Sequence, residues 1–269
     1  MIKCYFCGHK RPDTKGELKM SSLSAIILAG GEGKRMKSDK PKTLSEVLGK
    51  PILGWLLSSV RESGIENICV VTGYKKEYIE QYLEAMPFPV ETVFQSERLG
   101  TGHAVLMAKD FLEKNGGDVI ILNGDAPFMD SETILSSYNQ HSVSGAAATV
   151  ISARVSDPTG YGRIVRDENG NLKAITEHKD ADEKTRLIDE INSGGYWFNA
   201  HELLSVLTEI KSDNKSGEYY LPDAIKLLLA KGKSAGAFTA ESSDAVLGAN
   251  DPEQLRVLND IAKRRFGDK

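Results

Sequence analysis

The sequence predicts an α/β fold in which a mostly parallel central sheet carries helices on both of its faces. Short apolar runs typical of buried strands alternate with amphipathic segments of helical period through the first half of the chain. Glycine-rich and acidic residues follow some of these runs directly, and open α/β sheets bind ligands at the carboxyl ends of their strands. The second half changes to alternating polar and apolar residues, which predicts a β-rich insertion.

Each element of the first half is predicted from its own local pattern. Apolar runs predict buried strands at 24–29, 67–73, 89–95 and 118–125. Apolar positions at helical spacing predict helices at 51–64, 75–86 and 102–116. The first of these helices begins at Pro51 and stops at Gly64, which are ordinary start and stop signals.

The second half is predicted to contain a hairpin and further strand and helix pairs. A strand is expected at 145–155, and alternation over 161–179 with a turn at Asn169-Gly170 indicates the hairpin. The remaining expected elements are a strand then a helix over 194–210, a helix then a strand over 219–240, and a closing helix over 251–266.

The charge and the cysteine content limit what the protein binds and where it acts. The 269 residues include 34 basic and 38 acidic side chains, so the net charge is −4. This balance argues against nucleic-acid binding by bulk electrostatics, although the basic segment 34–42 is suited to phosphates. No apolar run approaches the roughly 20 residues of a membrane helix. Three cysteines and the lack of a secretory pattern at the start indicate a reducing cytoplasm.

The start of the chain stands apart from the rest. It carries half of a zinc-binding pattern, made of Cys4, Cys7 and His9. The remaining cysteine, Cys69, lies in a predicted buried strand, so a fourth ligand is missing. We expect residues 1–20 to form a poorly ordered extension and 21–269 to form one domain. Zinc binding at the start, or a true beginning at Met20, remain open alternatives.

The glycine-rich segment 28–36, "LAGGEGKRM", matches neither of two common phosphate-binding loops. A Walker loop needs serine or threonine after Gly33-Lys34, where this chain has Arg35. A dinucleotide-binding fingerprint needs a third glycine, where this chain has Met36. Small residues still let backbone N–H groups approach phosphates closely, so another kind of anion-binding loop is indicated.

Together with Pro41-Lys42, this segment resembles the signature of the sugar-1-phosphate nucleotidylyltransferases. Later motifs narrow the resemblance to the uridylyltransferase half of GlmU-type enzymes; in order, they are "QSERLGTGHA", "NGDAPF", "DPTGYGRIV", "EHKDA", "EINSG" and "GEYYLPD". The likeness runs from residue 24 into the closing helix.

The resemblance implies a Rossmann-like nucleotide-diphospho-sugar transferase fold, with a nucleotidyltransferase domain at 21–269 and a β-rich sugar-binding insertion. It implies an enzyme that makes UDP-N-acetylglucosamine and pyrophosphate from UTP and N-acetylglucosamine 1-phosphate, with Mg²⁺ as cofactor. No cysteine or histidine has the sequence surroundings of a nucleophile, so direct displacement is expected. The oligomeric state is left open.

The demands of this reaction suggest roles for the first motifs. Both partners are anionic, so catalysis consists mainly of charge neutralisation and alignment. Arg35 suits the phosphates of the leaving group, and Lys42 suits the two phosphates that meet, so both are candidate catalytic residues together with Asp125. The loop expected to wrap the nucleotide consists of Leu28, Ala29, Gly30 and Gly31.

The resemblance makes Asp125 and Asn250 the magnesium ligands, and adds Asn123 and Gly124 to the substrate contacts. A lone carboxylate after a hydrophobic strand needs a partner such as a metal. On the residues alone, Asp125 could instead cap a turn before Pro127, and Asn250 could cap the closing helix.

Base and sugar recognition are assigned to later motifs. Gln95 is expected to read the base, because its amide offers a donor and an acceptor to the imide edge of uracil. Gly100 and Thr101 are expected to close over the base. Arg98 stands where a second glutamine is common in the family, which bears on uridine selection. The expected sugar contacts are Gly162, Glu177 and Asn192, whereas rim or packing roles are expected for Tyr161, His178 and Tyr219.

Two other functions remain open at this stage. One is a nucleotidylyltransferase for another sugar 1-phosphate, such as glucose 1-phosphate, or for dTTP as donor. The other is a nucleotide-sugar-binding protein without catalysis, which should have lost a metal ligand or a phosphate-binding cation. The sequence retains Arg35, Lys42 and Asp125.

Overall fold

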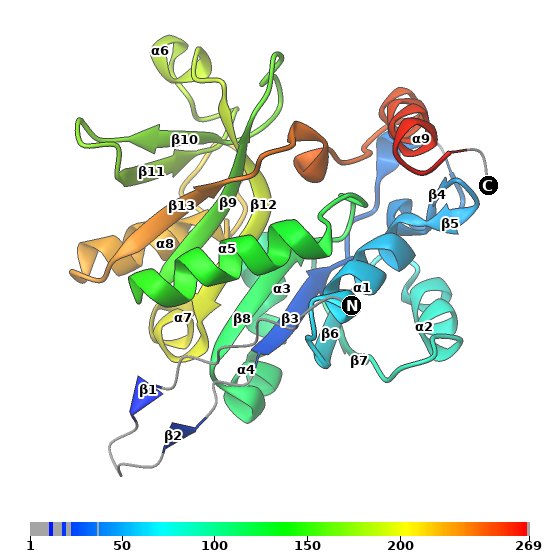
Figure 1. The fold of residues 1–269 in the computed structure, drawn as a ribbon, viewed down its shortest axis with the longest axis horizontal. Helices are drawn as coiled ribbons and strands as arrows, with labels where there is room; N and C mark the ends of the chain where they lie inside the picture. The colour runs from blue at the N-terminus through cyan, green and yellow to red at the C-terminus, as the bar shows by residue number, and fades with distance from the viewer. Residues whose placement is uncertain (1–10, 13–17, 20–22, 37, 268–269) are drawn as a thin grey trace, which may run out of the picture.

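The computed structural model describes residues 11–12, 18–19, 23–36 and 38–267 (Figure 1). Near the start, β1 (Arg11–Pro12) and β2 (Leu18–Lys19) form a short antiparallel pair. The candidate zinc ligands Cys4, Cys7 and His9 lie outside the described residues. Zinc binding and the division of the chain at residue 20 therefore stay predictions.

The centre of the large sheet is parallel. Its middle strand, β3 (Leu23–Leu28), pairs with β6 (Asn67–Thr72) on one side and β8 (Asp118–Asn123) on the other. Strand β7 (Glu91–Phe94) continues the sheet beyond β6 in the same direction. Each of these strands overlaps a segment predicted from its apolar run. Their carboxyl ends lie at one edge of the sheet because they all run the same way.

The other half of the sheet forms the β-rich insertion. Strand β12 (Glu190–Asn199) runs antiparallel to β8 and also pairs with β9 (Ala148–Arg154). It contacts β10 (Arg163–Arg166), which forms the predicted hairpin with β11 (Leu172–Thr176). Strand β13 (Ala235–Thr239) lies parallel to β9. A parallel core with a β-rich insertion is the predicted fold class.

Helices cover both faces of the sheet, as predicted (Figure 1). One face packs against α1 (Ile52–Glu62), α2 (Lys76–Glu84) and α5 (Ser131–Ser144). The other packs against α3 (Thr101–Met107), α4 (Lys109–Asn115), α7 (Ala200–Leu207) and α8 (Pro222–Ala230). Successive strand residues point to opposite faces, so Ile26 joins the second layer and Ile27 joins the first.

Some elements differ from the sequence-based expectation. The single helix expected over 102–116 is the pair α3 and α4, which meet at Ala108, where the backbone leaves helical geometry. Helix α5 was not predicted, because its many Ser, Thr and Asn residues favour caps and turns over helix interiors. A short helix, α6 (Glu183–Arg186), and a small pair of strands, β4 (Glu46–Val47) with β5 (Lys50–Pro51), were also not predicted.

The closing helix α9 (Pro252–Phe266) packs beside the segment that leads into α1. Its residues Leu258 and Ile261 share a hydrophobic cluster with Val47 of that segment. Asp251 caps the helix, because its Oδ1 accepts a hydrogen bond from the Gln254 N–H at 2.9 Å. This packing fixes the residues just before α9 against the loops at the carboxyl edge of the sheet.

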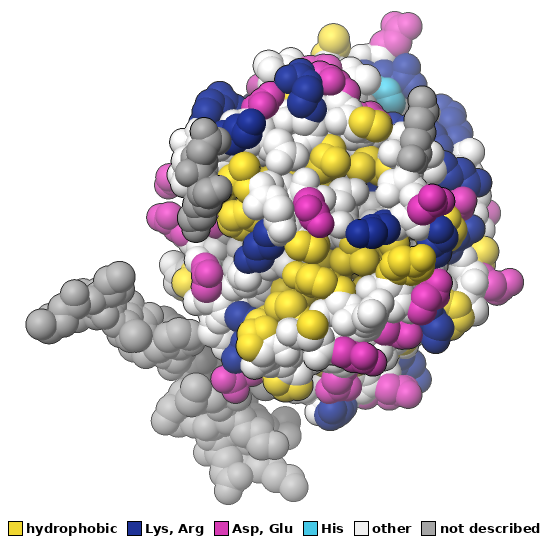
Figure 2. Space-filling view, turned by 90° about the vertical axis from the view of Figure 1, so that its right-hand side faces the viewer, with side chains coloured by type: hydrophobic (Ala, Val, Ile, Leu, Met, Phe, Trp, Pro, Cys, Tyr) yellow, Lys and Arg dark blue, Asp and Glu magenta, His cyan; other side chains and the backbone are white. Residues whose placement is uncertain are grey.

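Figure 2 views the molecule from the right-hand side of Figure 1, the side of α9 and α2. Apolar side chains form a band across this face among scattered charged ones. At the end of α9, Phe266 stacks on Trp55 with ring centroids 5.0 Å apart. Within the described part of the chain, no helix is long and apolar enough to cross a membrane.

Candidate active site

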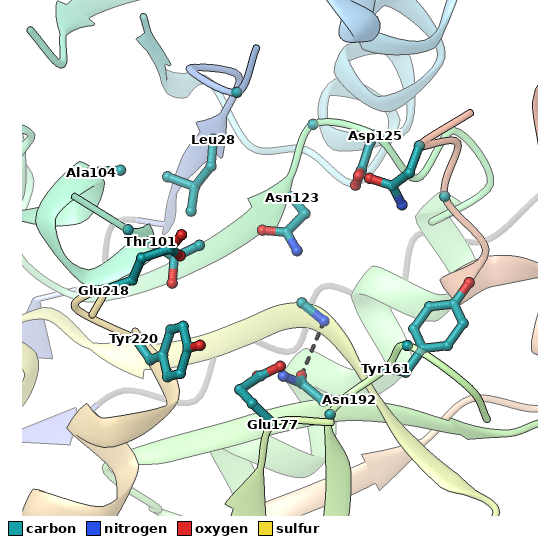
Figure 3. A pocket seen from close by; sticks show the side chains of 18 of the residues that line it. Leu28, Thr101, Ala104, Asn123, Asp125, Tyr161, Glu177, Asn192, Glu218 and Tyr220 are labelled. Carbon is teal, nitrogen blue, oxygen red and sulfur yellow. Dashed lines mark hydrogen bonds between the residues drawn. The ribbon is translucent and has the colours of Figure 1, made fainter. Parts of the chain in front are cut away.

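A cleft of about 860 Å³ lies where the carboxyl ends of β3 and β8 meet the β-rich insertion (Figure 3). Figure 3 shows Leu28 and Thr101 at one side, Asp125 at the other, and Glu177 beside Asn192 on the insertion. The predicted site residues that line the cleft are Leu28, Gly30, Gly31, Arg35, Lys42, Gln95, Gly100, Thr101, Asn123, Gly124, Asp125, Gly162, Glu177, Asn192 and Asn250.

Ala29 is the predicted site residue whose side chain lies elsewhere. It is fully buried in the hydrophobic layer beside α1, and its N–H donates to the Val71 carbonyl at 2.9 Å. Ala29 therefore continues the pairing of β3 with β6 for one residue, and the chain turns into the cleft only at Gly30. Ala29 was expected to wrap the nucleotide as part of a loop of small residues, with no role given to its side chain, and this stays a prediction.

Lys42, Asp125 and Asn250 meet in the cleft, and we call these residues the cation centre. The Lys42 ammonium donates to Asp125 Oδ2 at 2.5 Å and to Asn250 Oδ1 at 2.9 Å. Each residue is held by a different segment: Lys42 follows Pro41, Asp125 follows β8, and Asn250 precedes α9. The Ala249 N–H donates to the Asp125 carbonyl at 3.1 Å, which ties the last two segments together.

This arrangement fits a divalent cation. The oxygens of Asp125 and Asn250 converge on one positively charged atom, so the site stabilises a cation. A carboxylate and an amide oxygen are ligands that Mg²⁺ accepts, with substrate oxygens and water completing its shell. The described residues contain no cluster of three or more His, Cys, Asp or Glu that could hold a metal, so such an ion would depend on the substrate. The cap roles fall instead to Asp130 for α5 and Asp251 for α9.

The glycine-rich loop lies directly against the cation centre. Gly33 has a φ of +62°, and a Cβ there would lie 2.8 Å from the Cβ of Lys42. Glycine therefore lets the loop pack on the lysine stem. Arg35 follows in a short 3-10 turn, η1 (Lys34–Met36), and is exposed on the cleft wall together with Lys34. These cations can neutralise phosphate charge.

Gln95 also lines the cleft and is only 5% exposed. Its Nε2 donates to the Gly100 carbonyl at 3.1 Å and lies 3.0 Å from Nδ1 of His103. The Thr101 hydroxyl accepts from the Leu221 N–H at 3.0 Å. The loop that carries Gln95, Gly100 and Thr101 is thus fixed at both of its ends.

Arg98 reaches across the mouth of the cleft. Its Nη2 lies 3.1 Å from Oε2 of Glu32 in the glycine-rich loop, and its guanidinium lies 5.8 Å from the centroid of the Tyr74 ring. Glu32 also lies 3.6 Å from the Lys34 ammonium. Arg98 therefore links the loop of Gln95 to the loop expected to bind phosphates.

The insertion contributes two neighbouring polar residues, the half-buried Glu177 and the buried Asn192. The Gly194 N–H donates to Asn192 Oδ1 at 3.0 Å (the dashed line in Figure 3), and Asn192 Nδ2 donates to the Tyr196 hydroxyl at 2.7 Å. Gly194 has a φ of +76°, and a Cβ there would lie 2.0 Å from Nδ2 of Asn123, so only glycine fits.

The surroundings of the Glu177 carboxyl raise its pKa. Burial is the largest cause, and a hydrogen bond from Asn192 opposes it. The negative charges that add to the increase belong to Asp180, Asp223 and Glu218. Acidic groups therefore gather around Glu177 on the insertion side of the cleft, and they make its carboxyl harder to ionise.

The structure adds cleft residues that the sequence analysis did not assign. Tyr161, expected at the rim or in packing, lines the cleft wall, and Figure 3 shows its hydroxyl on the side of Asp125. Burial raises the pKa of Tyr161, and the charge of Asp125 adds to the increase. Other lining residues that were not assigned include Glu32, Ser193, Glu218 and Tyr220. All four lie inside quoted motifs, "LAGGEGKRM", "EINSG" and "GEYYLPD", so the motifs could have pointed to them.

The chain is similar to known proteins over most of its length. Residues 24–245 match the family model described as nucleotidyl transferase. The chain is 44% identical over 247 residues to the bifunctional protein GlmU of Acetivibrio thermocellus, covering 92% of this chain and 53% of that protein. It is 41% identical over 250 residues to the protein of the same name from Caldanaerobacter subterraneus subsp. tengcongensis, covering 93% and 54%. The chain thus spans about half the length of these curated relatives.

The fold is also found in a solved structure. A protein from Bacillus anthracis, described provisionally as a glucose-1-phosphate thymidylyltransferase in complex with sucrose, superposes with a TM-score of 0.74. The two are 20% identical, and the match covers 90% of this chain and 95% of the other, so this likeness concerns the fold. The family model covers most of the chain, and the expected resemblance is confirmed. The chain belongs to the nucleotidyl transferase family.

Proposed function

We propose that this protein is a uridylyltransferase that makes UDP-N-acetylglucosamine and pyrophosphate from UTP and N-acetylglucosamine 1-phosphate, with Mg²⁺ as cofactor. The family and the GlmU relatives support transfer of a nucleotidyl group to a sugar phosphate. A cytoplasmic location, expected from the low cysteine content, is part of the proposal.

The observation that carries the proposal is that one cleft is lined by the cation centre, by Gln95 and by the pair Glu177 and Asn192. Lys42 is bound to Asp125 and Asn250 there. Gln95 has an amide that suits a base, and Glu177 has a carboxyl that suits sugar hydroxyls. A nucleotide bound by Gln95 and a sugar phosphate bound by Glu177 would bring their phosphates together at the cation centre.

The chemistry needs no proton transfer to start. An oxygen of the sugar phosphate attacks the α-phosphorus of UTP, and the bond from that phosphorus to the bridging oxygen of the β-phosphate breaks. Pyrophosphate leaves with the electron pair. A magnesium ion held by Asp125 and Asn250 would neutralise phosphate charge and polarise the phosphoryl group.

Side chains of the protein align the two substrates and neutralise the remaining phosphate charge. Lys42 binds the phosphates that meet, and Arg35 binds the departing phosphates, where negative charge grows. Gln95 selects the base, while Glu177 and Asn192 hold the sugar. Direct attack requires no covalent enzyme intermediate, so protein incubated with α-labelled UTP alone should retain no label.

The test is a substrate panel with pyrophosphate as the readout. The protein is incubated with Mg²⁺ and each combination of UTP, dTTP or CTP with N-acetylglucosamine 1-phosphate or glucose 1-phosphate. We expect the highest kcat/KM for UTP with N-acetylglucosamine 1-phosphate, and no turnover with EDTA. A clear preference for glucose 1-phosphate or dTTP would instead establish the alternative transferase, and no pyrophosphate from any pair would leave only nucleotide-sugar binding.

A further inference from the structure

His103 is a residue of α3 that contacts Gln95, which lines the cleft. Its Nδ1 lies 3.0 Å from Gln95 Nε2. Gln95 is 5% exposed, so its amide has little access to water and depends on protein partners. The orientation of this amide is therefore set by the groups around it.

The Gly100 carbonyl distinguishes the NH₂ group of the Gln95 amide from its oxygen. A carbonyl oxygen can only accept, and it lies 3.1 Å from the Gln95 atom that also faces His103. That atom must be the NH₂ group. The amide oxygen then points the other way, toward Gly30, where a Cβ would lie 3.0 Å from Oε1.

This arrangement also fixes the tautomer of the His103 ring. An NH₂ group has two hydrogens, and here one is donated to Gly100 and the other to His103. His103 Nδ1 must carry a lone pair to accept, so its ring hydrogen is on Nε2. Both donors of Gln95 are consumed inside the protein, which leaves Oε1 as the group it can offer to a ligand.

We propose that His103 is a positioning residue that determines base specificity, by keeping the oxygen of Gln95 turned toward the nucleotide. This proposal rests on the proposed function, in which Gln95 reads the base. Oε1 can accept from the ring N3–H of uracil. Cytosine has a lone pair at the same ring position, so two acceptors would face each other and cytosine is rejected.

Without the acceptor on His103, only Gly100 opposes rotation of the amide. Rotation would turn the NH₂ group toward the nucleotide, where it could donate to the ring nitrogen of cytosine. The loss should therefore appear as weaker discrimination between UTP and CTP rather than as a general loss of catalysis. A purely structural role for His103 would not change this ratio.

The experiment compares His103→Leu, His103→Asn and wild type for kcat/KM with UTP and with CTP. Leucine fills the space but offers no acceptor, whereas the Oδ1 of asparagine can take the place of Nδ1. His201→Leu, at an exposed histidine on α7, is the matched control. We expect the UTP-to-CTP ratio to fall about tenfold in His103→Leu, the scale of one lost hydrogen bond. The ratio should stay within about threefold of wild type in His103→Asn and His201→Leu.

A second readout does not depend on activity. In ¹⁵N-labelled protein, the His103 ring should show an unprotonated Nδ1, and the Gln95 side-chain amide signals should move in His103→Leu but not in His201→Leu. An unchanged UTP-to-CTP ratio in His103→Leu, an equal loss in His103→Asn, or a protonated Nδ1 would overturn the inference. Failure of the proposed function is distinguishable, because wild type would then prefer another donor or sugar phosphate, or release no pyrophosphate, in the substrate panel.

Discussion

Lys42 Nζ lies 2.5 Å from Asp125 Oδ2, although the two residues are 83 positions apart in the sequence. The same ammonium lies 2.9 Å from Asn250 Oδ1. A lysine that binds both candidate magnesium ligands competes with a metal for their oxygens. Entry of a divalent cation with the nucleotide would therefore free Lys42 to bind phosphate.

The first prediction is that Lys42→Met separates metal binding from catalysis. Removing the ammonium leaves the oxygens of Asp125 and Asn250 available, so the nucleotide-free variant should bind Mn²⁺ roughly tenfold more tightly than wild type. Turnover should fall by about two orders of magnitude or more, because a phosphate-binding cation is lost. Mn²⁺ titration followed by electron paramagnetic resonance measures the first effect, and pyrophosphate release measures the second.

Lys114→Met serves as the control for this prediction. Lys114 is also paired with a carboxylate, Glu91 at 2.7 Å, but on the exposed surface. The control should alter neither Mn²⁺ affinity nor turnover. Weaker Mn²⁺ binding in Lys42→Met would show that the lysine supports the metal instead of competing with it.

The second prediction concerns the charge of Asp125. Asp125→Asn keeps the size of the side chain but removes the charge that holds a hard cation. Magnesium-dependent turnover should fall by about two orders of magnitude, the scale of losing a stabiliser of transition-state charge. Asn250→Ala should cost less, because a neutral ligand contributes less. Near-normal turnover in Asp125→Asn, measured over a range of Mg²⁺ concentrations, would place the metal site elsewhere.

The strands that could be predicted most directly are those with the same apolar environment on both faces. Strands β3, β6 and β8 are covered on both faces, so their sequences are continuous apolar runs. Strand β12 was expected to begin four residues later, at 194 rather than Glu190. Its first residues include Asn192, which lines the cleft, and the pairing with β9 shifts between Asn192 and Gly195. A strand that also builds the site breaks its own pattern.

The contacts within the candidate site could not be predicted from the sequence either. The order of motifs identifies residues that line the cleft, but it does not give their contacts. That Lys42 binds Asn250, 208 positions away, depends on how α9 packs against the segment that contains Val47. The position of Ala29 depends on where β3 ends, which can differ by one residue without any change in the apolar pattern. His103 lies within a quoted motif, yet only the fold brings its Nδ1 to Gln95.

The third prediction concerns the ion pair of Arg98 and Glu32, which should affect UTP binding in opposite directions. Glu32 is an acid in a loop expected to bind phosphates, so Glu32→Gln should lower the KM for UTP. Arg98→Gln removes a cation and leaves Glu32 less shielded, so it should raise that KM. Each change should be a factor of about two to five, because both side chains are partly exposed.

The double variant tests whether these effects share one origin. With Glu32 and Arg98 both replaced by glutamine, the KM for UTP should return near the wild-type value. The kcat should be similar in all the variants, because neither residue belongs to the cation centre. Shifts of the same sign in the two single variants would contradict electrostatic shielding, and persistence of the shifts in high salt would do so as well.

The last prediction is that Glu177→Gln stabilises the fold in a pH-dependent way while weakening sugar binding. Burial raises the pKa of Glu177 above its ordinary value of 4.5, and the charges of Asp180, Asp223 and Glu218 add to this. Above that ordinary value the unfolded chain loses its proton more readily than the folded one. The stability of wild type should therefore fall as pH rises toward the folded pKa, and then level off.

Glutamine cannot ionise, so the variant should escape this loss. Its Tm should exceed that of wild type at pH 7, and the difference should shrink as the pH approaches 4, where Glu177 is protonated in both states. The KM for N-acetylglucosamine 1-phosphate should rise, because a strong acceptor for sugar hydroxyls is lost. Glu168→Gln, at an exposed acid in the β10–β11 turn, should change neither quantity. A Tm difference that is constant across pH would show that Glu177 is stabilised by packing and hydrogen bonds alone, because an ionisation effect must vanish below its pKa.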